Sequence, residues 1–366
     1  MKVFRRMPVV ACLAVLATFA TSCGGGGNPC KVPSDKVNDS GVTVGVAFDV
    51  GGIGDKSFND AAKRGLDKAI DEGLIKEATC IEPDATGSNR DENVISLADD
   101  GADLVIAVGF AFSPGVNTNA GNYPNTNFAV IDGYATCPPE FCSDIPNPAP
   151  ANVLDLAFKE QEGSYLVGAA AALQAAKVNC TTVGFLGGQT GQLIGKFEAG
   201  YTAGAKAINP DIQVLVQYIG DDVTAFNDAV KGEALSTSMY DDGACIIYHA
   251  AGASGAGLFT AAVKADKLAI GVDSDQYLLV SEEQQPLVMT SMLKRVDTAV
   301  HDAVAAQGDG TFTGGAAQVF GLAEEGIDYS VSNADLMTSD ITDKLNELKQ
   351  QIISGEIVVP DDPTKV

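Results

Sequence analysis

The sequence predicts an α/β protein of two lobes, each a parallel sheet flanked by helices, with a ligand cleft between the lobes. Strand-like apolar runs alternate with helical stretches from about residue 42 to the end of the chain, which is typical of parallel sheets with crossover helices. The pattern restarts near Val153, and 366 residues exceed what one core usually holds. We expect an N-terminal lobe of residues 41–157 plus about 286–325, and a C-terminal lobe of residues 158–285 plus about 326–366.

A glycine-rich turn follows the first predicted strand, residues 42–48. The glycines of segment 51–54 let the backbone approach a ligand, and Asp55 or Ser57 can cap the helix that follows. A phosphate-binding loop carries G-x-x-x-x-G-K, but here the residue before Lys56 is Asp55, whose carboxylate would repel phosphate. The turn is therefore not a nucleoside triphosphate site.

The residues beside this turn favour a flat, neutral ligand. Phe48 and Asp49 stand at the carboxyl end of the strand, where open α/β sheets bind their ligands. Phe58 and Asn59 lie in the first turn of the next helix. Aromatic, carboxylate and amide groups around an open backbone suit a ligand that both stacks and accepts or donates hydrogen bonds.

The later elements follow in regular alternation. The expected helices cover residues 59–72, 90–100, 161–176, 196–208, 229–240, 257–265, 296–307 and 340–355. The expected strands cover residues 78–82, 104–108, 127–131, 153–158, 182–186, 212–218, 245–250, 268–272, 286–292 and 317–321. We expect the last two strands to complete the sheet of the first lobe, so that the chain crosses between the lobes more than once.

Candidate ligand-binding residues gather at the ends of these strands. Phe48, Asp132, Gly252 and Asp273 each end or follow a strand, and Phe226 lies in a later loop. Doubly wound sheets bring such positions into one crevice. Two lobes that face each other would form one cleft, which closes by hinge motion.

The N-terminus has the organisation of an export signal. Basic residues precede an apolar run at 8–20, which is shorter than the roughly 20 residues that span a bilayer. Small residues then precede Cys23, which resembles the acylated cysteine of a bacterial lipobox. We expect a signal peptide at 1–22, a lipidated tether at 23–40 and a location on the extracytoplasmic face of the cell membrane.

Charge excludes one class of partner. The formal net charge is −25; removal of Lys2, Arg5 and Arg6 with the signal leaves 20 basic and 48 acidic residues, or −28. Nucleic acid and anionic lipid surfaces are poor partners for such a chain.

The cysteines indicate disulfides. Six remain outside the signal and lipobox, an even number in an exported chain, and six cysteines allow 15 pairings. The chain has no C-x-x-C pair and only two histidines, so we expect no metal site. Cys30 and Cys80 precede or begin early strands of the first lobe, so we expect them to pair. Cys180 and Cys245 begin strands that would be neighbours in a 2-1-3 order, so a bridge between them is expected as well. The third expected bridge joins Cys137 with Cys142, which can close a local loop.

Five segments carry a resemblance to a known family: residues 48–59, 158–163, 197–204, 270–276 and 290–295. In this order and spacing they resemble the basic membrane protein family of ABC-transporter substrate-binding lipoproteins. The resemblance runs from about residue 44 to 355 and implies the type I periplasmic-binding-protein fold. Members of this family bind purine nucleosides, and one branch binds riboflavin.

The resemblance also implies roles for the site. Phe48 and Phe226 would stack on the two faces of a purine, and Asn59 and Asp132 would hydrogen-bond the base edge. The backbone near Gly252, with Asp273 and Lys294, would hold ribose hydroxyls. Further ligand-binding candidates are Asp49, Phe58 and Asp275. Only one of Asp273 and Asp275 is expected to point into the cleft, and Phe197 is expected in the core, on the apolar face of its helix.

Three functions compete. The main hypothesis is a non-catalytic, monomeric, lipid-anchored receptor without cofactor that delivers a nucleoside to an ABC permease; a riboflavin or sugar receptor of the same fold is the alternative. A secreted nucleoside-processing enzyme could use Asp49, Asp55, Asp132 or Asp273, but the chain has no recognisable nucleophile motif. The third is a surface sensor that reports ligand occupancy by closing.

Overall fold

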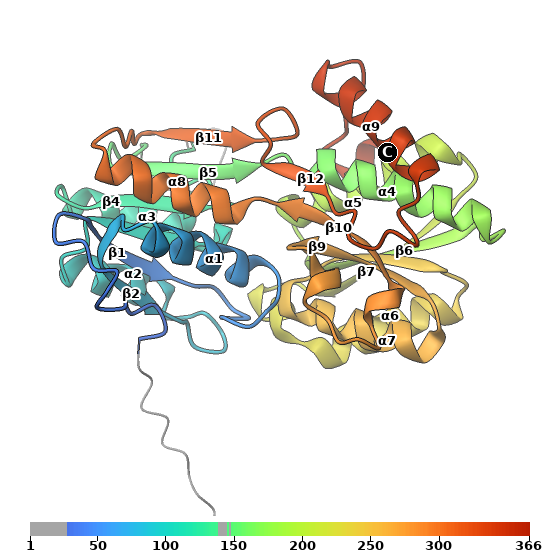
Figure 1. Ribbon diagram of the computed structural model, residues 1–366, viewed down its shortest axis with the longest axis horizontal. Helices are drawn as coiled ribbons and strands as arrows, with labels where there is room; N and C mark the ends of the chain where they lie inside the picture. Colours follow the sequence, from blue (N-terminus) through green and yellow to red (C-terminus); the bar gives the residue numbers. More distant parts are fainter. Residues whose placement is uncertain (1–27, 138–144, 146–147) are drawn as a thin grey trace, which may run out of the picture.

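The computed structural model describes residues 28–137, 145 and 148–366. They form two lobes that lie side by side, each with its own six-stranded sheet (Figure 1). The predicted signal peptide, Cys23, part of the tether and Cys142 lie outside the described residues.

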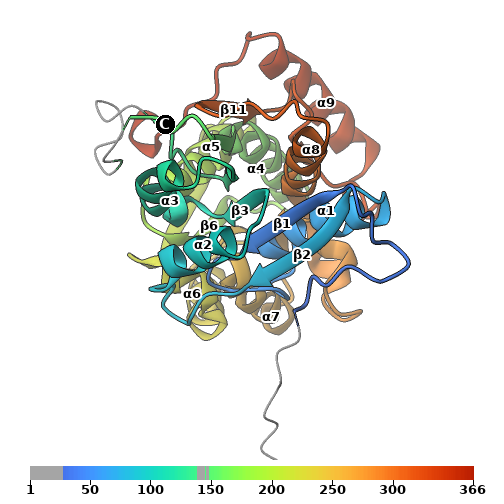
Figure 2. The same cartoon turned by 90° about the vertical axis from the view of Figure 1, so that its left-hand side faces the viewer.

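The first lobe is built on an all-parallel sheet whose strand order is β11-β5-β4-β3-β1-β2. Helices α1 and α8 cover one face of the sheet, and α2 and α3 cover the other (Figure 2). Alternate residues of each strand point to opposite faces, so the strands have apolar side chains on both faces and both need to be covered. The elements are β1 (Val42–Ala47), α1 (Phe58–Asp71), β2 (Ile75–Ile81), α2 (Arg90–Asp99), β3 (Leu104–Val108), α3 (Ser113–Asn119), β4 (Asn127–Ile131), β5 (Val153–Phe158), α8 (Val296–Gly308) and β11 (Ala316–Phe320).

The second lobe repeats this order as β12-β10-β9-β8-β6-β7, with only β12 antiparallel to its neighbour. Helices α4, α5 and α9 cover one face, and α6 and α7 cover the other. The elements are α4 (Glu160–Lys177), β6 (Thr182–Gln189), α5 (Gln192–Ile208), β7 (Gln213–Gly220), α6 (Ala229–Asp241), β8 (Ile246–Ala250), α7 (Ala256–Ala265), β9 (Leu268–Asp273), β10 (Val288–Lys294), β12 (Ile327–Tyr329) and α9 (Ser339–Ile353).

Helices α4 and α5 pack unusually close together. A methyl group built on Gly204 would lie 1.9 Å from the carbonyl oxygen of Tyr165, and one on Gly168 would lie 2.1 Å from that of Tyr201. Only glycine fits at these two contacts.

One predicted lobe boundary is wrong. We expected residues 286–292 to complete the first sheet, but β10 pairs with β9 in the second sheet. The chain returns to the first lobe only after β10, where α8 packs against α1 so closely that a methyl group on Gly65 would lie 2.3 Å from the carbonyl oxygen of Asp297. The segment that returns to the first lobe therefore begins with α8, and not with β10. The later strand, β11, does join the first sheet as expected.

Two short elements were not predicted. Helix α3 forms in a stretch for which no helix or strand was predicted; Pro114 stands in its first turn, where proline is tolerated. Strand β12 has only three residues, too few for a periodic pattern.

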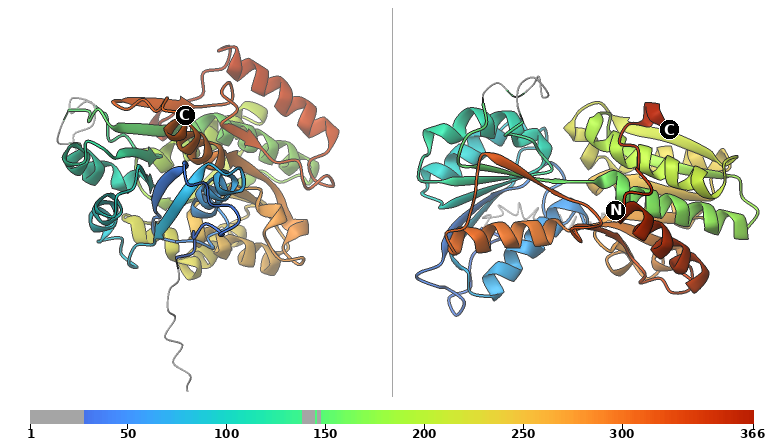
Figure 3. Two further views of the ribbon diagram at one scale, coloured as in Figure 1. Left: turned by 60° about the vertical axis from the view of Figure 1, so that its left-hand side comes forward. Right: turned by 90° about the horizontal axis from the view of Figure 1, so that it is seen from above.

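The chain passes between the lobes three times. It crosses from β5 to α4, returns from β10 to α8, and crosses again between β11 and β12 (Figure 3, right). None of the helices in the described part of the chain combines the length and apolar character needed to span a membrane.

Two of the predicted disulfides are confirmed. Cys30 pairs with Cys80 in the first lobe, and Cys180 pairs with Cys245 in the second. The second bridge joins the residues before two neighbouring strands, β6 and β8, as the 2-1-3 order requires. The pairing of Cys137 with Cys142 stays a prediction because Cys142 is outside the described residues.

Candidate functional site

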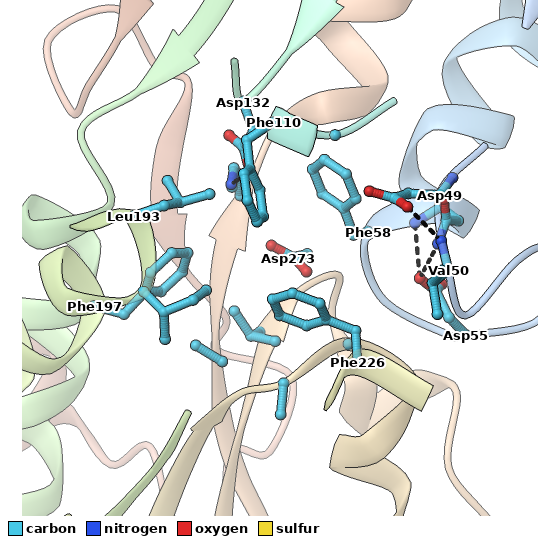
Figure 4. A pocket seen from close by; sticks show the side chains of 18 residues that line it. Asp49, Val50, Asp55, Phe58, Phe110, Asp132, Leu193, Phe197, Phe226 and Asp273 are labelled. Carbon is cyan, nitrogen blue, oxygen red and sulfur yellow. Dashed lines mark hydrogen bonds and ion pairs between the residues drawn. The ribbon is translucent and has the colours of Figure 1, made fainter. Parts of the chain in front are cut away.

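A pocket lies between the lobes at the carboxyl ends of the strands (Figure 4). Its volume is about 70 Å³, whereas small-molecule pockets usually have about 300–1,000 Å³. Among the predicted site residues, those that line it are Asp49, Phe58, Asn59, Asp132, Phe226, Gly252, Asp273 and Lys294.

Four aromatic rings enclose the pocket, two from each lobe. Phe58 begins α1 and Phe110 follows β3, whereas Phe197 lies on α5 and Phe226 in the short helix Val223–Asn227. The rings of Phe110 and Phe226 meet edge to face across the pocket, with centroids 6.4 Å apart. Aromatic faces thus come from both lobes, and they approach each other when the lobes are close.

Lys294 is the centre of the polar side of the pocket. Its side chain is almost fully buried at the end of β10, and its Nζ pairs with Oδ2 of Asp132 and lies 3.4 Å from Oε1 of Glu160. Glu160 is in turn paired with Lys196, whose Nζ is 3.1 Å from its Oε2. Lys294 Nζ also lies 5.2–5.3 Å from the ring centroids of three phenylalanines, Phe58, Phe158 and Phe197, in the geometry of cation–π contacts.

This cluster has more carboxylates than ammonium groups. Burial alone lowers the pKa of Lys294, but Asp132, Glu160 and Asp273 together raise it above its ordinary value. Burial raises the pKa of Asp132 although Lys294 opposes the shift. Burial also raises the pKa of Asp273. Two lysines therefore face three carboxyl groups, and burial disfavours the ionised forms of Asp132 and Asp273.

The two cleft aspartates have the same unusual backbone. Asp132 and Asp273 both have φ of 62°, in the left-handed region that few residues other than glycine, asparagine and aspartate adopt. Asp132 directly follows β4, and Asp273 ends β9. Strands β4 and β9 are each the fourth strand of their lobe, so a turn at the same place in each lobe brings one carboxylate to the pocket.

The glycine-rich turn is held by its own side chains. The carboxylate of Asp55 accepts hydrogen bonds from the backbone N–H groups of Ser57, Asn59 and Asp60, and so caps α1 as predicted. The amide of Asn59 accepts a bond from the backbone N–H of Asp49 and donates one to Asp55, at 3.0 Å each. Only one N–H of the side-chain amide of Asn59 therefore remains for a ligand.

Asp49 lines the pocket but has a fixed partner. The guanidinium of Arg90 donates to its Oδ1 from both Nε, at 2.8 Å, and Nη2. Arg90 was missed because it is 41 residues away in the chain, and no local pattern links the two.

Direct hydrogen bonds join the lobes beside the pocket. The hydroxyl of Ser57 donates to Oδ2 of Asp273 at 2.6 Å, and Arg64 donates to the hydroxyl of Ser274 at 2.9 Å. The side chain of Gln276 donates to the carbonyl oxygen of Lys56 at 3.1 Å. The start of α1 is thus tied to the end of β9.

Two predicted site residues lie elsewhere. Phe48 is fully buried and does not line the pocket; it continues the face of Val44 and Val46, at two-residue spacing, into the core. The prediction that Phe48 stacks on a ligand is therefore wrong. Asp275 also lies outside the pocket lining and accepts a hydrogen bond from Ser332, so Asp273 alone of this pair faces the cleft. Residues two apart in an extended segment share a face, so the left-handed turn at Asp273, at the end of β9, is what separates the two side chains.

Two aromatic residues of the pocket were missed. Phe197 was expected in the core; it is buried, but it also lines the pocket. Phe110 follows β3, and its position just after the carboxyl end of a strand was the signal that could have identified it.

Two lobes that meet over a pocket at their strand ends define a solute-binding protein with an interlobe site. The chain is similar to a solved structure of this class, a solute-binding protein of an ABC transporter system from Aeropyrum pernix K1, with a TM-score of 0.75 and 28% identity over 88% of this chain and 94% of the other. The family model described as "ABC transporter substrate-binding protein PnrA-like" matches residues 42–363.

Curated relatives agree with this family. The ABC transporter nucleoside-binding protein BmpA of Lactococcus lactis is 33% identical and covers 97% of this chain and 99% of its own. Basic membrane protein A of Borreliella burgdorferi is 34% identical over 85% of both chains. The chain belongs to the PnrA-like family of ABC transporter substrate-binding proteins, which implies a small-molecule ligand and a permease as partner.

Proposed function

We propose that the protein binds a nucleoside, with preference for a purine, in the interlobe pocket and delivers it to an ABC permease. The observation that carries the proposal is the pairing of aromatic rings from both lobes with buried carboxylates and an ammonium group in one pocket. A nucleoside has the matching halves, a flat base and a sugar with several hydroxyl groups. The similarity to a protein named for nucleoside binding supports the same choice.

Each lobe supplies part of the binding surface. Phe58 and Phe226 are the rings proposed to stack on the base, in place of the pair predicted from the sequence. Oδ1 of Asp132 has no hydrogen-bond partner among the described residues and is buried, so it is suited to accept a bond from the base edge, together with the free N–H of Asn59. Asp273 and Lys294, with the backbone at Gly252, are proposed to hold the ribose hydroxyls.

Ligand entry requires the lobes to separate. A pocket of about 70 Å³ is too small for a nucleoside, and the rings of Phe110 and Phe226 already meet across it. The three crossing segments allow a hinge rotation that parts these rings. We infer a cycle in which the open form admits the nucleoside and the closed form presents it to the permease.

Cys23 is proposed to carry the lipid that keeps the protein at the extracytoplasmic face of the membrane. The protein with Cys23→Ala should appear in the soluble fraction after cell breakage and bind ligand as the wild type does. Retention of this variant in the membrane fraction would show that the anchor lies elsewhere.

The test of ligand class is isothermal titration calorimetry with purified protein against purine nucleosides, pyrimidine nucleosides, free bases, riboflavin and sugars. We expect purine nucleosides to bind most tightly, and free adenine to bind much more weakly than adenosine. A ligand bound only by the folded state adds about 2.7 kcal/mol of stability at 100 times its Kd, so thermal unfolding provides an independent check. Tighter binding of riboflavin or a free base would overturn the nucleoside proposal.

The same samples separate a receptor from an enzyme. After incubation, chromatography of the released ligand should return the intact nucleoside. Recovery of free base and ribose would instead identify a nucleoside-processing enzyme.

A further inference from the structure

A second cavity, here called the outer chamber, adjoins the interlobe pocket. It has a volume of about 600 Å³ and lies between the first-lobe residues Gly133 and Tyr134 and the second-lobe residues Gln161, Gln189 and Lys196. The two cavities share four wall residues: Phe110, Asp132, Leu193 and Ile194. Three of these, Phe110, Asp132 and Leu193, lie near one another in Figure 4. A ligand in the pocket would therefore reach the chamber by passing Asp132.

The chamber contains buried acceptors without donors. Oε1 of Gln161 and Oε1 of Gln189 are inaccessible to solvent and have no hydrogen-bond partner among the described residues. The amide nitrogen of Gln189 donates to the carbonyl oxygen of Asp221 at 3.2 Å, which fixes the orientation of that amide. Oδ1 of Asp132, in the wall between the cavities, is also unpartnered. Folded proteins rarely leave buried acceptors unpaired, because each costs about as much as a lost hydrogen bond.

Charge limits what could satisfy these acceptors. Lys196 is already paired with Glu160 at 3.1 Å, and Lys159 with Glu162 at 3.6 Å, so neither lysine is a free site for an anion. Asp132 and Asp361 also line the chamber and would repel one. The matching group is neutral and carries O–H or N–H donors.

We propose that the outer chamber is a second subsite, which takes a neutral, hydroxyl- or amino-bearing extension of the ligand held in the interlobe pocket. This proposal rests on the proposed nucleoside function and deepens it: the preferred ligand is larger than a simple nucleoside. Once the lobes have separated to admit it, the ligand places hydrogen-bond donors against Gln161 and Gln189, whose oxygens are closed to solvent in this structure.

The test compares pairs of adenosine derivatives that differ only by a hydroxyl group. One pair carries a 2-hydroxyethyl or a propyl group on N6, and the other carries the same two groups on the 5′ oxygen, because the attachment point depends on how the nucleoside lies. For one of the two attachment points, calorimetry should show that the hydroxyl compound binds about tenfold more tightly than its propyl partner.

Three variants assign this preference to the chamber. Gln161→Leu and Gln189→Leu should each reduce the hydroxyl preference several-fold while leaving the affinity for adenosine unchanged, and the unchanged affinity shows that the variants are folded. Gln192→Leu is the control, since Gln192 lines the same chamber but is exposed; it should keep the preference.

The outcomes separate the two proposals. Binding of adenosine without any hydroxyl preference, or a preference that survives both leucine substitutions, would overturn the second subsite alone. Failure of every nucleoside to bind would overturn the proposed function and this proposal with it.

Discussion

The two lobes share a strand order but differ in what ends the fifth strand. In the order β2-β1-β3-β4-β5 and its repeat β7-β6-β8-β9-β10, the fourth strand leads to Asp132 or Asp273 with the same φ of 62°. The fifth strand ends in Phe158 in the first lobe and in Lys294 in the second. The shared scaffold thus supplies a pair of carboxylates, and a single unmatched lysine makes the cleft asymmetric. Because the two sides of the cleft differ in charge, the two orientations of a bound ligand differ in energy, and one orientation is favoured.

The largest expected effect comes from removing this asymmetry. Lys294→Met leaves Asp132, Glu160 and Asp273 buried without their shared cation, and breaking a buried ion pair usually costs about 3–5 kcal/mol. Urea denaturation should show a loss of unfolding free energy of this size. The control is Lys264→Met, which removes an exposed ion pair with Glu233 and should change stability little. Similar results for the two variants would mean that Lys294 does not hold the cluster together.

The disulfides test whether the lobes are equally dependent on their crosslinks. The bridges Cys30–Cys80 and Cys180–Cys245 close loops with sequence separations of 50 and 65, which predicts nearly equal losses of about 2–4 kcal/mol when either pair is changed to serine. Denaturation of the two double variants under non-reducing conditions measures both. A large loss for one pair only would show that strain or local packing, and not chain entropy, sets the contribution.

A buried histidine in the second lobe, which has no counterpart in the first, makes the stability of the protein depend on pH in acid. The penultimate residue of β8 is His249, whereas that of β3 is Ala107. Burial lowers the pKa of His249 to about 4, although its hydrogen bond with Gln276 opposes the shift. The folded-state pKa lies below the ordinary value near 6.5, so stability from the neutral ring is present above about pH 6.5 and is lost as the pH falls toward 4.

The variant His249→Gln should lose this pH dependence. The difference in unfolding free energy between the wild type and the variant should shrink by at most about 3 kcal/mol between pH 7 and 4. Asp55 and Asp155 have pKa values raised by burial to about 6 and titrate in the opposite sense, but they are present in both proteins and cancel in the difference. A constant difference across this range would contradict a buried neutral ring.

The smallest expected effect is on affinity and compares the aromatic walls of the two lobes. Phe58→Ala and Phe226→Ala should each weaken the binding of purine nucleosides by about 1–3 kcal/mol, the usual contribution of one stacked aromatic ring. Calorimetry would measure both. Phe48→Ala is the control: it should cost about 3–5 kcal/mol of stability as a core substitution, with no direct effect on affinity. Equal affinity losses in all three variants would argue against a stacking role for the two pocket rings.

Strand ends were the most informative feature of the sequence. Alternating apolar runs gave most elements their type and order, and the turn after each strand gave Asp132, Gly252 and Asp273 their place in the pocket. These features are local, so they can be read from neighbouring residues. The bridge Cys180–Cys245 followed from them, because the strand order brings its two cysteines together.

What was missed depends on distant contacts. Whether β10 joins the first or second sheet depends on which edge it pairs with, and no residue within the strand decides it. Phe48 and Phe58 are ten residues apart in one segment, yet a change from strand to helix sends one into the core and the other into the pocket. Phe197 shows that an apolar helix face can serve as core and pocket wall at once.

The three crossings between the lobes have a consequence for biosynthesis. The first lobe lacks α8 and β11 until residues 296–320 have been made, although its other strands end at residue 158, and the second lobe lacks β12 and α9 until residue 353. Neither lobe can complete its core on the ribosome while the last part of the chain is still unmade. A chain with this connectivity stays incompletely folded until translation is nearly finished.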